Sequence, residues 1–241
     1  MRVMLLVGLL GSSLASAQTV TLDAGVLGAS VAVAPRVDVE PLDPSAKPSW
    51  VLPAHTELVV TKPGAVRQGR VDVVSLEAWQ RLLAKAPSAR RSCLASPLKA
   101  LTQSLRTPGG QLTEKALLGC PDASAGFLLF PTRVRFEGGE GWLFLTAWFI
   151  EPVHLSNRLL EWNFQGLTAD GSTWVSVSIP ASVNALPEDD GSALLSTSQA
   201  RRSHAEAARF LTTMGPARIQ PPLEEVRRFV ESMSVAPATQ R

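Results

Sequence analysis

The chain has 241 residues, which is long enough for one large domain or two small ones. Its 45% hydrophobic and 18% charged residues are typical of a folded globular protein and exclude an intrinsically disordered chain. With 23 basic and 21 acidic residues, the charge is nearly balanced, so there is no electrostatic reason to expect a nucleic acid or an anionic membrane surface as partner.

The N-terminus carries the pattern of a secretory signal peptide. Arg2 supplies a positive charge, Val3–Leu10 form a short apolar run, and Ala15 and Ala17 place small residues where a signal peptidase recognises them. We therefore expect residues 1–17 to be removed and the mature chain to be exported to the periplasm, the cell envelope or the extracellular space. The apolar run is too short to cross a bilayer of roughly 30 Å, so no membrane span is expected. No cysteine lies near the cut, so we expect no lipid anchor.

The segment after the signal, residues 18–49, is rich in Ala, Val and Pro and is expected to be extended and partly joined to a sheet. Short strands are predicted at Val20–Leu22 and Val31–Val39, and the proline inside the second would confine it to a sheet edge. No Gly/Ser linker or internal repeat interrupts the rest of the chain. We therefore expect a single domain over residues 50–235 and a disordered tail over residues 236–241.

The following part of the chain changes from a strand pattern to a helix pattern. β-branched residues in Thr56–Thr61 and Arg70–Val74 predict two strands that flank a Pro-Gly turn. Apolar residues then recur at steps of three and four, and Ser75 is expected to cap a helix that ends before Pro87. A second helix is predicted to begin with Pro97 at its first position.

The strongest strand signals lie in the second half of the chain and predict the centre of the fold. A glycine-rich tip at residues 137–140 and an Asp-Gly turn at Asp170 are short connections, so the strands that they join should be antiparallel neighbours. We expect a meander of four strands, Phe127–Phe136, Gly141–Ile150, Leu159–Leu167 and Ser172–Ile179.

Two amphipathic helices are predicted to close the chain, at Ser198–Thr213 and Pro222–Met233. Since a helix and a sheet each bury an apolar face, we expect both helices to pack on the meander. The predicted fold class is α+β: an antiparallel meander sheet with helices packed on it. The PsbP-like sandwich is an architecture of this kind, by analogy at the level of the fold.

The two cysteines, Cys93 and Cys120, predict a disulfide, because cysteine pairs in exported chains are usually joined. The bond would close a loop of roughly 27 residues and stabilise the fold by about 3–4 kcal/mol in the chain-entropy model. Two free buried thiols are the alternative. A zinc pair lacks the CxxC spacing or the nearby histidine that would supply its other ligands.

Aromatic residues gather on the predicted strands, several of them with the same parity. If that face were open, it would form a stacking surface for sugar rings or peptide side chains. The candidate ligand-binding residues are then Trp142, Trp148, Trp162 and Trp174. The alternative is that the face is core, which the two terminal helices favour because they need an apolar surface to cover.

No motif for catalysis, metal binding or a cofactor is recognisable. The GxSxG and SxxK patterns of serine nucleophiles are absent, as is a DxDxDG calcium loop, and the three histidines have no metal-site spacing. We therefore predict no catalytic residue, no metal and no cofactor. The competing interpretation is a secreted hydrolase whose site assembles only in three dimensions, from Glu151, His154, Glu161 and Asp170.

The segment Phe164–Gly171, followed by Trp174–Val177 and Ile179-Pro180, resembles an uncharacterised family of exported bacterial envelope proteins and lipoproteins. The family pattern is QGLT-x-DG, then an aromatic residue with Val and Ser, a Pro and a Leu-Pro pair, here Leu186-Pro187. The likeness is specific over Val134–Pro187. This chain differs by lacking the lipidation cysteine and by carrying Trp where the family often has Tyr. The resemblance implies an envelope location and supplies no catalytic residues.

The functional prediction is an exported, non-enzymatic envelope or extracellular protein that binds a partner, a wall polymer or a small ligand. It depends on the export signal, the expected disulfide and the lack of a convergent nucleophile, acid–base or metal set. The partner is expected to be an envelope component, and the residues carry no signal for an oligomeric state.

Overall fold

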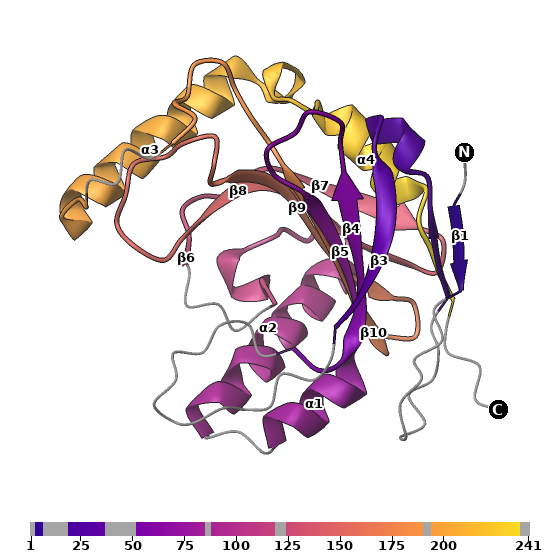
Figure 1. Cartoon of the computed structure of the whole chain (residues 1–241). Coiled ribbons are helices and arrows are strands. Elements are labelled where there is room, and N and C mark those ends of the chain that lie inside the picture. The colour runs from indigo at the N-terminus through magenta and orange to yellow at the C-terminus, as the bar shows by residue number, and fades with distance from the viewer. Residues whose placement is uncertain are drawn as a thin grey trace.

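The computed structural model describes residues 3–6, 19–36, 52–84, 88–118, 124–189 and 194–236, with the backbone alone for residues 3–6, 35–36 and 88–93. Within these residues the chain forms a large curved sheet with helices on both of its faces (Figure 1). The predicted α+β class is confirmed. No helix in the described part of the chain combines the length and the apolar character needed to span a membrane.

The large sheet is antiparallel throughout, with strand order β3-β4-β5-β10-β9-β8-β6 and with β7 also paired to β8. The predicted meander is confirmed as β7-β8-β9-β10. The strands are β3 (Ser30–Arg36), β4 (His55–Thr61), β5 (Gly69–Ser75), β6 (Ser124–Ala125), β7 (Leu129–Phe136), β8 (Gly139–Phe149), β9 (Leu160–Thr168) and β10 (Thr173–Pro180).

The proline-containing strand β3 lies at the edge of this sheet, as predicted, because a proline lacks the N–H that a second neighbouring strand would need. The last strand of the meander, β10, pairs with β5, so the two predicted strand groups form one continuous sheet.

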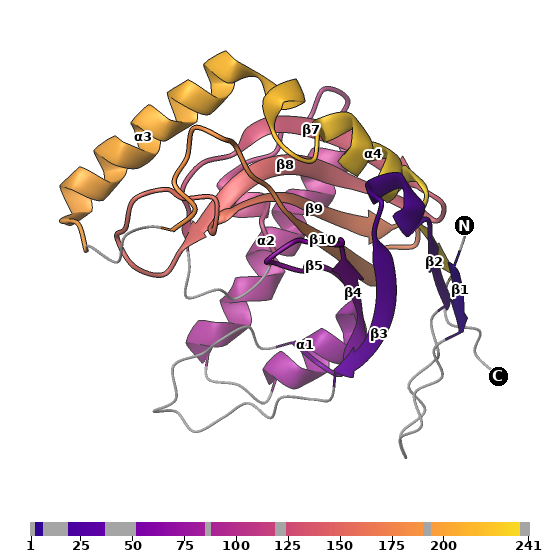
Figure 2. The ribbon, with the colours of Figure 1, turned by 45° about the horizontal axis from the view of Figure 1, so that its top comes forward.

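A second, three-stranded sheet joins the two ends of the chain. It consists of β1 (Val3–Leu6), β2 (Thr19–Leu22) and β11 (Ser234–Ala236), with β2 in the centre. Figure 2 shows β1 and β2 side by side, close to the labelled termini. β1 falls inside the predicted signal peptide, whereas the predicted cut lies outside the described residues. Since β2 also pairs with β11, it keeps a neighbouring strand if residues 1–17 are removed.

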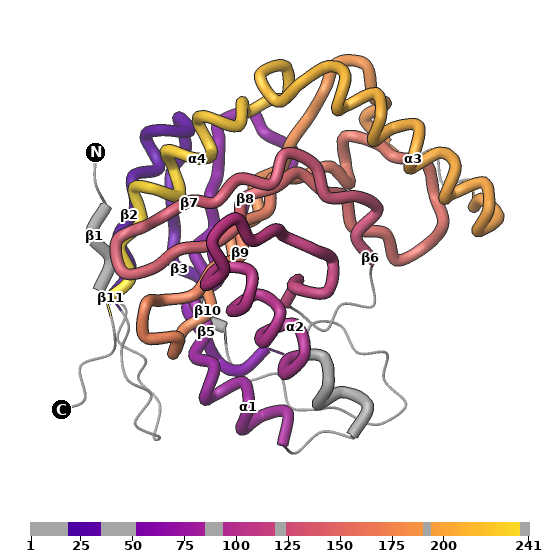
Figure 3. Tube along the Cα trace, turned by 180° about the vertical axis from the view of Figure 1, so that it is seen from behind, coloured from indigo at the N-terminus to yellow at the C-terminus, as the bar shows by residue number. Residues whose placement is uncertain are grey.

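Helices α1 and α2 lie on one face of the large sheet, and α4 with the 3-10 turn η1 lies on the other (Figures 1 and 3). Helix α3 projects along one end of the sheet (Figure 2). The helices are α1 (Leu76–Ala84), α2 (Ser88–Arg106), α3 (Thr197–Met214) and α4 (Leu223–Glu231), with 3-10 turns η1 (Ala24–Leu27), η2 (Glu114–Ala116) and η3 (Pro216–Arg218).

Each face of the sheet has its own hydrophobic core, because successive side chains of a strand point to opposite faces. In β5, Val73 packs in the core under α4, and its neighbour Val74 packs in the core over α1 and α2. In β10, Val175 likewise faces α4, whereas Trp174 faces α1. Trp174 and Ser176, which share the second face of β10, are both buried.

One predicted helix boundary needs correction. α2 begins at Ser88 and holds Pro97 in its interior, because its buried stripe extends backwards to Leu94, one turn before the proline. Both terminal helices contact the meander, α4 against β7 and β9 and α3 against β7, but α3 buries only Ala200 and Leu211. The N-cap of α1 is confirmed, since the Ser75 hydroxyl accepts a hydrogen bond of 3.3 Å from the backbone N–H of Ala78.

The expected disulfide lies outside the described residues. Cys93 belongs to α2, but its side chain is not described, and Cys120 falls in the gap between residues 118 and 124. The bond therefore stays a prediction.

Candidate functional site

Three of the four candidate tryptophans lie inside the two cores. Trp142, Trp162 and Trp174 are 7%, 0% and 1% exposed. The indole N–H of Trp162 donates to the backbone oxygen of Pro221 at 2.8 Å, and that of Trp142 donates to the hydroxyl of Ser104 at 3.0 Å. These rings have almost no surface to offer a ligand, so their role in the structure is packing.

Trp148 is the one candidate tryptophan with a partly exposed ring. Its indole N–H donates to Glu161 at 2.8 Å, and the same carboxylate accepts hydrogen bonds from Asn163 at 3.1 Å and Ser178 at 2.5 Å. The guanidinium of Arg67 lies 3.9 Å from it. Glu161 is therefore held in place by its neighbours on one face of the sheet.

The four residues of the hydrolase interpretation are not brought together. Glu161 stands at the start of β9 and Asp170 beyond its other end. Since a strand rises about 3.3 Å per residue, the seven residue steps from Glu161 to Thr168 alone separate the two carboxylates by roughly 23 Å.

Asp170 is the turn residue that its Asp-Gly sequence predicts. Its carboxylate accepts hydrogen bonds from the Thr168 hydroxyl at 2.6 Å and from the Ser172 backbone N–H at 3.0 Å. These bonds, the Thr168 bond above all, stabilise the charged form and lower the pKa of Asp170.

Glu151 and His154 lie in the connection between β8 and β9, next to α3. Nδ1 of His154 is 3.0 Å from the hydroxyl of Ser203 on α3, a distance that a nucleophile and its base would show. A serine nucleophile also needs a third group that orients the base and donors for an oxyanion. In the described part of the chain, no carboxylate is hydrogen-bonded to His154, so this pair falls short of a catalytic triad.

The His154–Ser203 pair lines a groove of about 360 Å³ between α3 and the connections on either side of β9 and β10. This volume is in the range of about 300–1,000 Å³ that is usual for binding sites. The other lining residues are mainly apolar: Leu155, Ala185, Leu186, Glu206, Ala207 and Phe210. Ser203, Glu206, Ala207 and Phe210 follow the i, i+3, i+4, i+7 spacing, so one stripe of α3 forms a wall of the groove.

Helix α3 leaves this stripe open because it is attached along a different stripe. Ala200 and Leu211 are buried, and the imidazole of His204 stacks on Phe149. A capping box of Ser196 and Gln199 satisfies the first backbone N–H groups of the helix, so its N-terminus is stable without further packing.

Exposed apolar and basic side chains border the groove. Phe210 in its wall is 43% exposed. Arg202 and Arg209 are exposed on the adjoining stripe of α3, and neither forms an ion pair with any residue that the structure describes. The groove therefore combines an exposed aromatic ring with two cations that have no ion-pair partner among the described residues.

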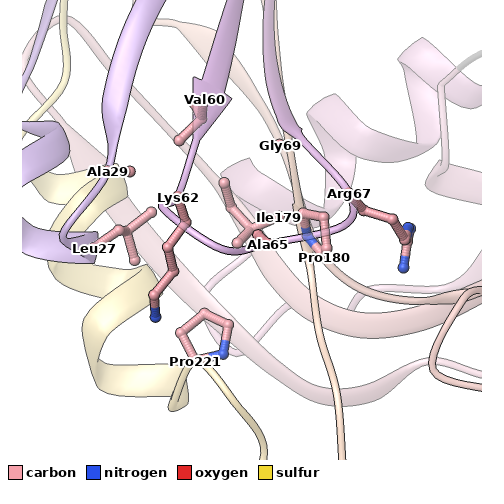
Figure 4. A pocket seen from close by; sticks show the side chains of 10 residues that line it. All are labelled: Leu27, Ala29, Val60, Lys62, Ala65, Arg67, Gly69, Ile179, Pro180 and Pro221. Carbon is pink, nitrogen blue, oxygen red and sulfur yellow. The ribbon is translucent and has the colours of Figure 1, made fainter. Parts of the chain in front are cut away.

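A second cavity, at the β4–β5 connection, is too small for a ligand. It has a volume of about 60 Å³, and Figure 4 shows its lining of mainly apolar side chains, including Leu27, Val60 and Ile179. In Figure 4, Arg67 points away from these side chains. Its guanidinium donates to the backbone oxygens of Asn157 and Leu160, and burial lowers the pKa of Arg67.

Sequence reasoning missed a polar cluster on β4 and β5, on the sheet face that also carries Val74. His55, Glu57 and Asp72 are all buried, and each offers a ligand atom within 4.8 Å of the others. Glu57 and Asp72 are directly paired across β4 and β5, and His55 lies two residues from Glu57 on the same face. The signal that could have found them is a charged residue, Asp72, inside a run of valines.

The chain was compared with protein-family models, curated proteins and solved structures, and none of the three comparisons gives a match.

Proposed function

We propose that this is an exported, non-enzymatic binding protein, and that its groove beside α3 binds an acidic segment of an envelope protein. The apolar anchor of this contact is Phe210 in the groove wall. The observation that carries the proposal is the position of Phe210, half exposed in the groove wall, next to Arg202 and Arg209, which form no ion pair with any described residue. Export itself is supported by the leader-like residues 1–17.

The size of the groove favours a peptide segment over a large rigid ligand. Burial of one aromatic ring contributes about 1.5–3 kcal/mol, which is enough for a central anchor. Cations at the rim of the groove increase the association rate and the specificity for acidic ligands more than the affinity. We therefore expect binding to depend strongly on the anchor and to weaken as salt increases.

A peptide-binding assay tests this proposal. Fluorescein-labelled 12-residue peptides that alternate Asp or Glu with Leu or Phe are titrated with the purified protein, and anisotropy reports binding. The comparison set has Lys or Arg at the acidic positions. We expect the acidic set to bind more tightly, with Phe210→Ala weakening binding about 10-fold or more. Arg202→Glu with Arg209→Glu should remove the preference for acidic peptides.

Val66→Ala is the matched control for the anchor, because Val66 is a fully exposed apolar residue on the β4–β5 connection and does not line the groove. Equal binding of the acidic and basic sets would contradict the proposal, as would unchanged binding by Phe210→Ala. Preference for wall-polymer fragments over both peptide sets would assign the groove to a different ligand class.

A further inference from the structure

The imidazole of His55 has a fixed orientation. Its Nδ1 lies 2.8 Å from the backbone oxygen of Pro53. A carbonyl oxygen can only accept a hydrogen bond, so Nδ1 must carry the proton. In a neutral ring the other nitrogen, Nε2, then presents its lone pair. This is the arrangement found in metal-binding histidines, where a backbone carbonyl holds the ring nitrogen that does not bind the metal.

The Nε2 lone pair of His55 faces a second acceptor. Oδ1 of Asp72 lies 3.2 Å away. Oδ2 of the same carboxylate lies 2.8 Å from Nε of Arg70. Two acceptors at 3.2 Å repel each other unless a cation lies between them, and that cation is either a proton or a metal ion.

Glu57 adds a third ligand atom on the same face. It pairs directly with Asp72 across the two strands, and both carboxylates are 3% exposed. Like charges opposite each other in a sheet are destabilising, and burial increases the cost. Arg70 contacts both acids, at 2.8 Å to Asp72 and at 4.0 Å to Glu57, but its side chain is 41% exposed. A divalent ion among the ligand atoms would stabilise the pair from inside.

We propose that His55, Glu57 and Asp72 bind one divalent transition-metal ion, and that Zn²⁺ is the ion that they fit best. In a tetrahedral zinc site with bonds of about 2.0–2.1 Å, neighbouring ligand atoms lie roughly 3.3–3.4 Å apart. The 3.2 Å between Nε2 of His55 and Oδ1 of Asp72 matches this separation. One imidazole with two carboxylates suits zinc more than calcium or magnesium, which prefer oxygen ligands alone.

The test is metal binding by the full-length protein after dialysis against EDTA. Calorimetric titration with Zn²⁺ should show one ion per chain, tighter than Mn²⁺ and much tighter than Ca²⁺. His55→Gln should weaken zinc binding at least 100-fold. His154→Gln is the matched control, because it removes an exposed imidazole outside the cluster.

Two measurements on the unaltered chain keep the proposal testable if His55→Gln fails to fold. The chain has three histidines, so ¹⁵N NMR can follow each ring, and zinc should shift Nε2 of His55 alone. X-ray absorption at the zinc edge should find nitrogen and oxygen ligands only. If the His55 ring stays doubly protonated in excess zinc, a proton and not a metal ion lies between its Nε2 and the Asp72 carboxylate, and the proposal is overturned. Sulfur ligands would also overturn it, because they would place the ion at the cysteines.

Discussion

The imidazole of His204 lies flat against the ring of Phe149, with the ring centroids 3.7 Å apart and the planes inclined by 21°. Nε2 of the same imidazole lies 2.8 Å from the backbone oxygen of Val153 and donates to it. One side chain thus joins α3 both to the end of β8 and to the connection that follows. This attachment decides which stripe of α3 faces the groove.

Replacement of His204 by alanine should loosen α3 without unfolding the sheet. The stacking contributes about 0.5–1.5 kcal/mol and the hydrogen bond about 1 kcal/mol, so we expect a local loss of about 1.5–2.5 kcal/mol. Hydrogen exchange of the α3 amides should accelerate, and amides of β9 should keep their protection. Arg209→Ala is the control, because Arg209 is exposed on α3 and forms no ion pair with any described residue. Unchanged exchange in α3 would show that other contacts hold the helix.

Replacement of a buried tryptophan should destabilise the protein more than replacement of the partly exposed Trp148. Trp162 is completely buried and donates a hydrogen bond, so Trp162→Ala should cost about 3–5 kcal/mol of unfolding free energy. Trp148 is partly exposed, and Glu161 keeps Asn163 and Ser178 as donors after its removal, so Trp148→Ala should cost about 1–2 kcal/mol. Urea unfolding measures both values. Equal losses at the two positions would contradict the assignment of Trp148 to the surface.

The meander was predictable because its turns are local. The glycine-rich tip and the Asp-Gly turn each connect neighbouring strands over a few residues, and turn chemistry of that kind specifies the partner strand. The pairing of β10 with β5 joins segments far apart in the chain, and no local signal specifies it. The burial of Trp174 follows from that pairing, which brings the strand under α1.

The two candidate sites depend on relationships that residue patterns do not contain. Glu57 and Asp72 face each other only in the observed register, and the long β4–β5 connection, unlike a two-residue turn, does not specify a register. The groove exists because α3 is attached through His204 at the end of the sheet. The periodicity of α3 predicted the helix and its apolar stripe but not the surface that the stripe would meet.

Asp170 should make the stability of the protein depend on pH at acid values. Its pKa is lowered in the folded state, first by the Thr168 hydroxyl and then by Ser172. A group with a lowered folded pKa stabilises the fold above its unfolded pKa, near 3.9, and loses that contribution as the pH falls through the folded pKa. Since the side chain is largely exposed, screening keeps the effect small.

Asp170→Asn tests this pH dependence. At pH 7 the variant should be less stable by about 1 kcal/mol or less, the range of one net hydrogen bond. Near pH 2 the difference should be smaller, because this stabilisation is lost progressively as the pH falls below the unfolded pKa and through the lowered folded pKa. Thermal unfolding at both pH values measures the difference. A stability difference of the same size at pH 2 would mean that it arises from the shape of the turn and not from the charge of Asp170.

Pro97 is expected to weaken the helix that contains it. It lies inside α2, where it cannot donate to the backbone oxygen four residues earlier and its ring crowds that oxygen. Proline in a helix interior lowers the unfolding free energy by about 3 kcal/mol. Its restriction of the unfolded chain raises the same free energy by about 0.4–1 kcal/mol. Some packing of the partly buried ring is lost on substitution, so Pro97→Ala should raise the unfolding free energy by about 1–2 kcal/mol.

The matched control is Pro222→Ala, at the N-cap of α4, where proline interrupts no helical hydrogen bond and has an extended backbone. This change should give no gain, because the alanine only adds freedom to the unfolded chain. Denaturant unfolding of both variants provides the comparison. A loss of stability in Pro97→Ala would mean that the proline ring packs against its neighbours more strongly than its missing hydrogen bond weakens α2.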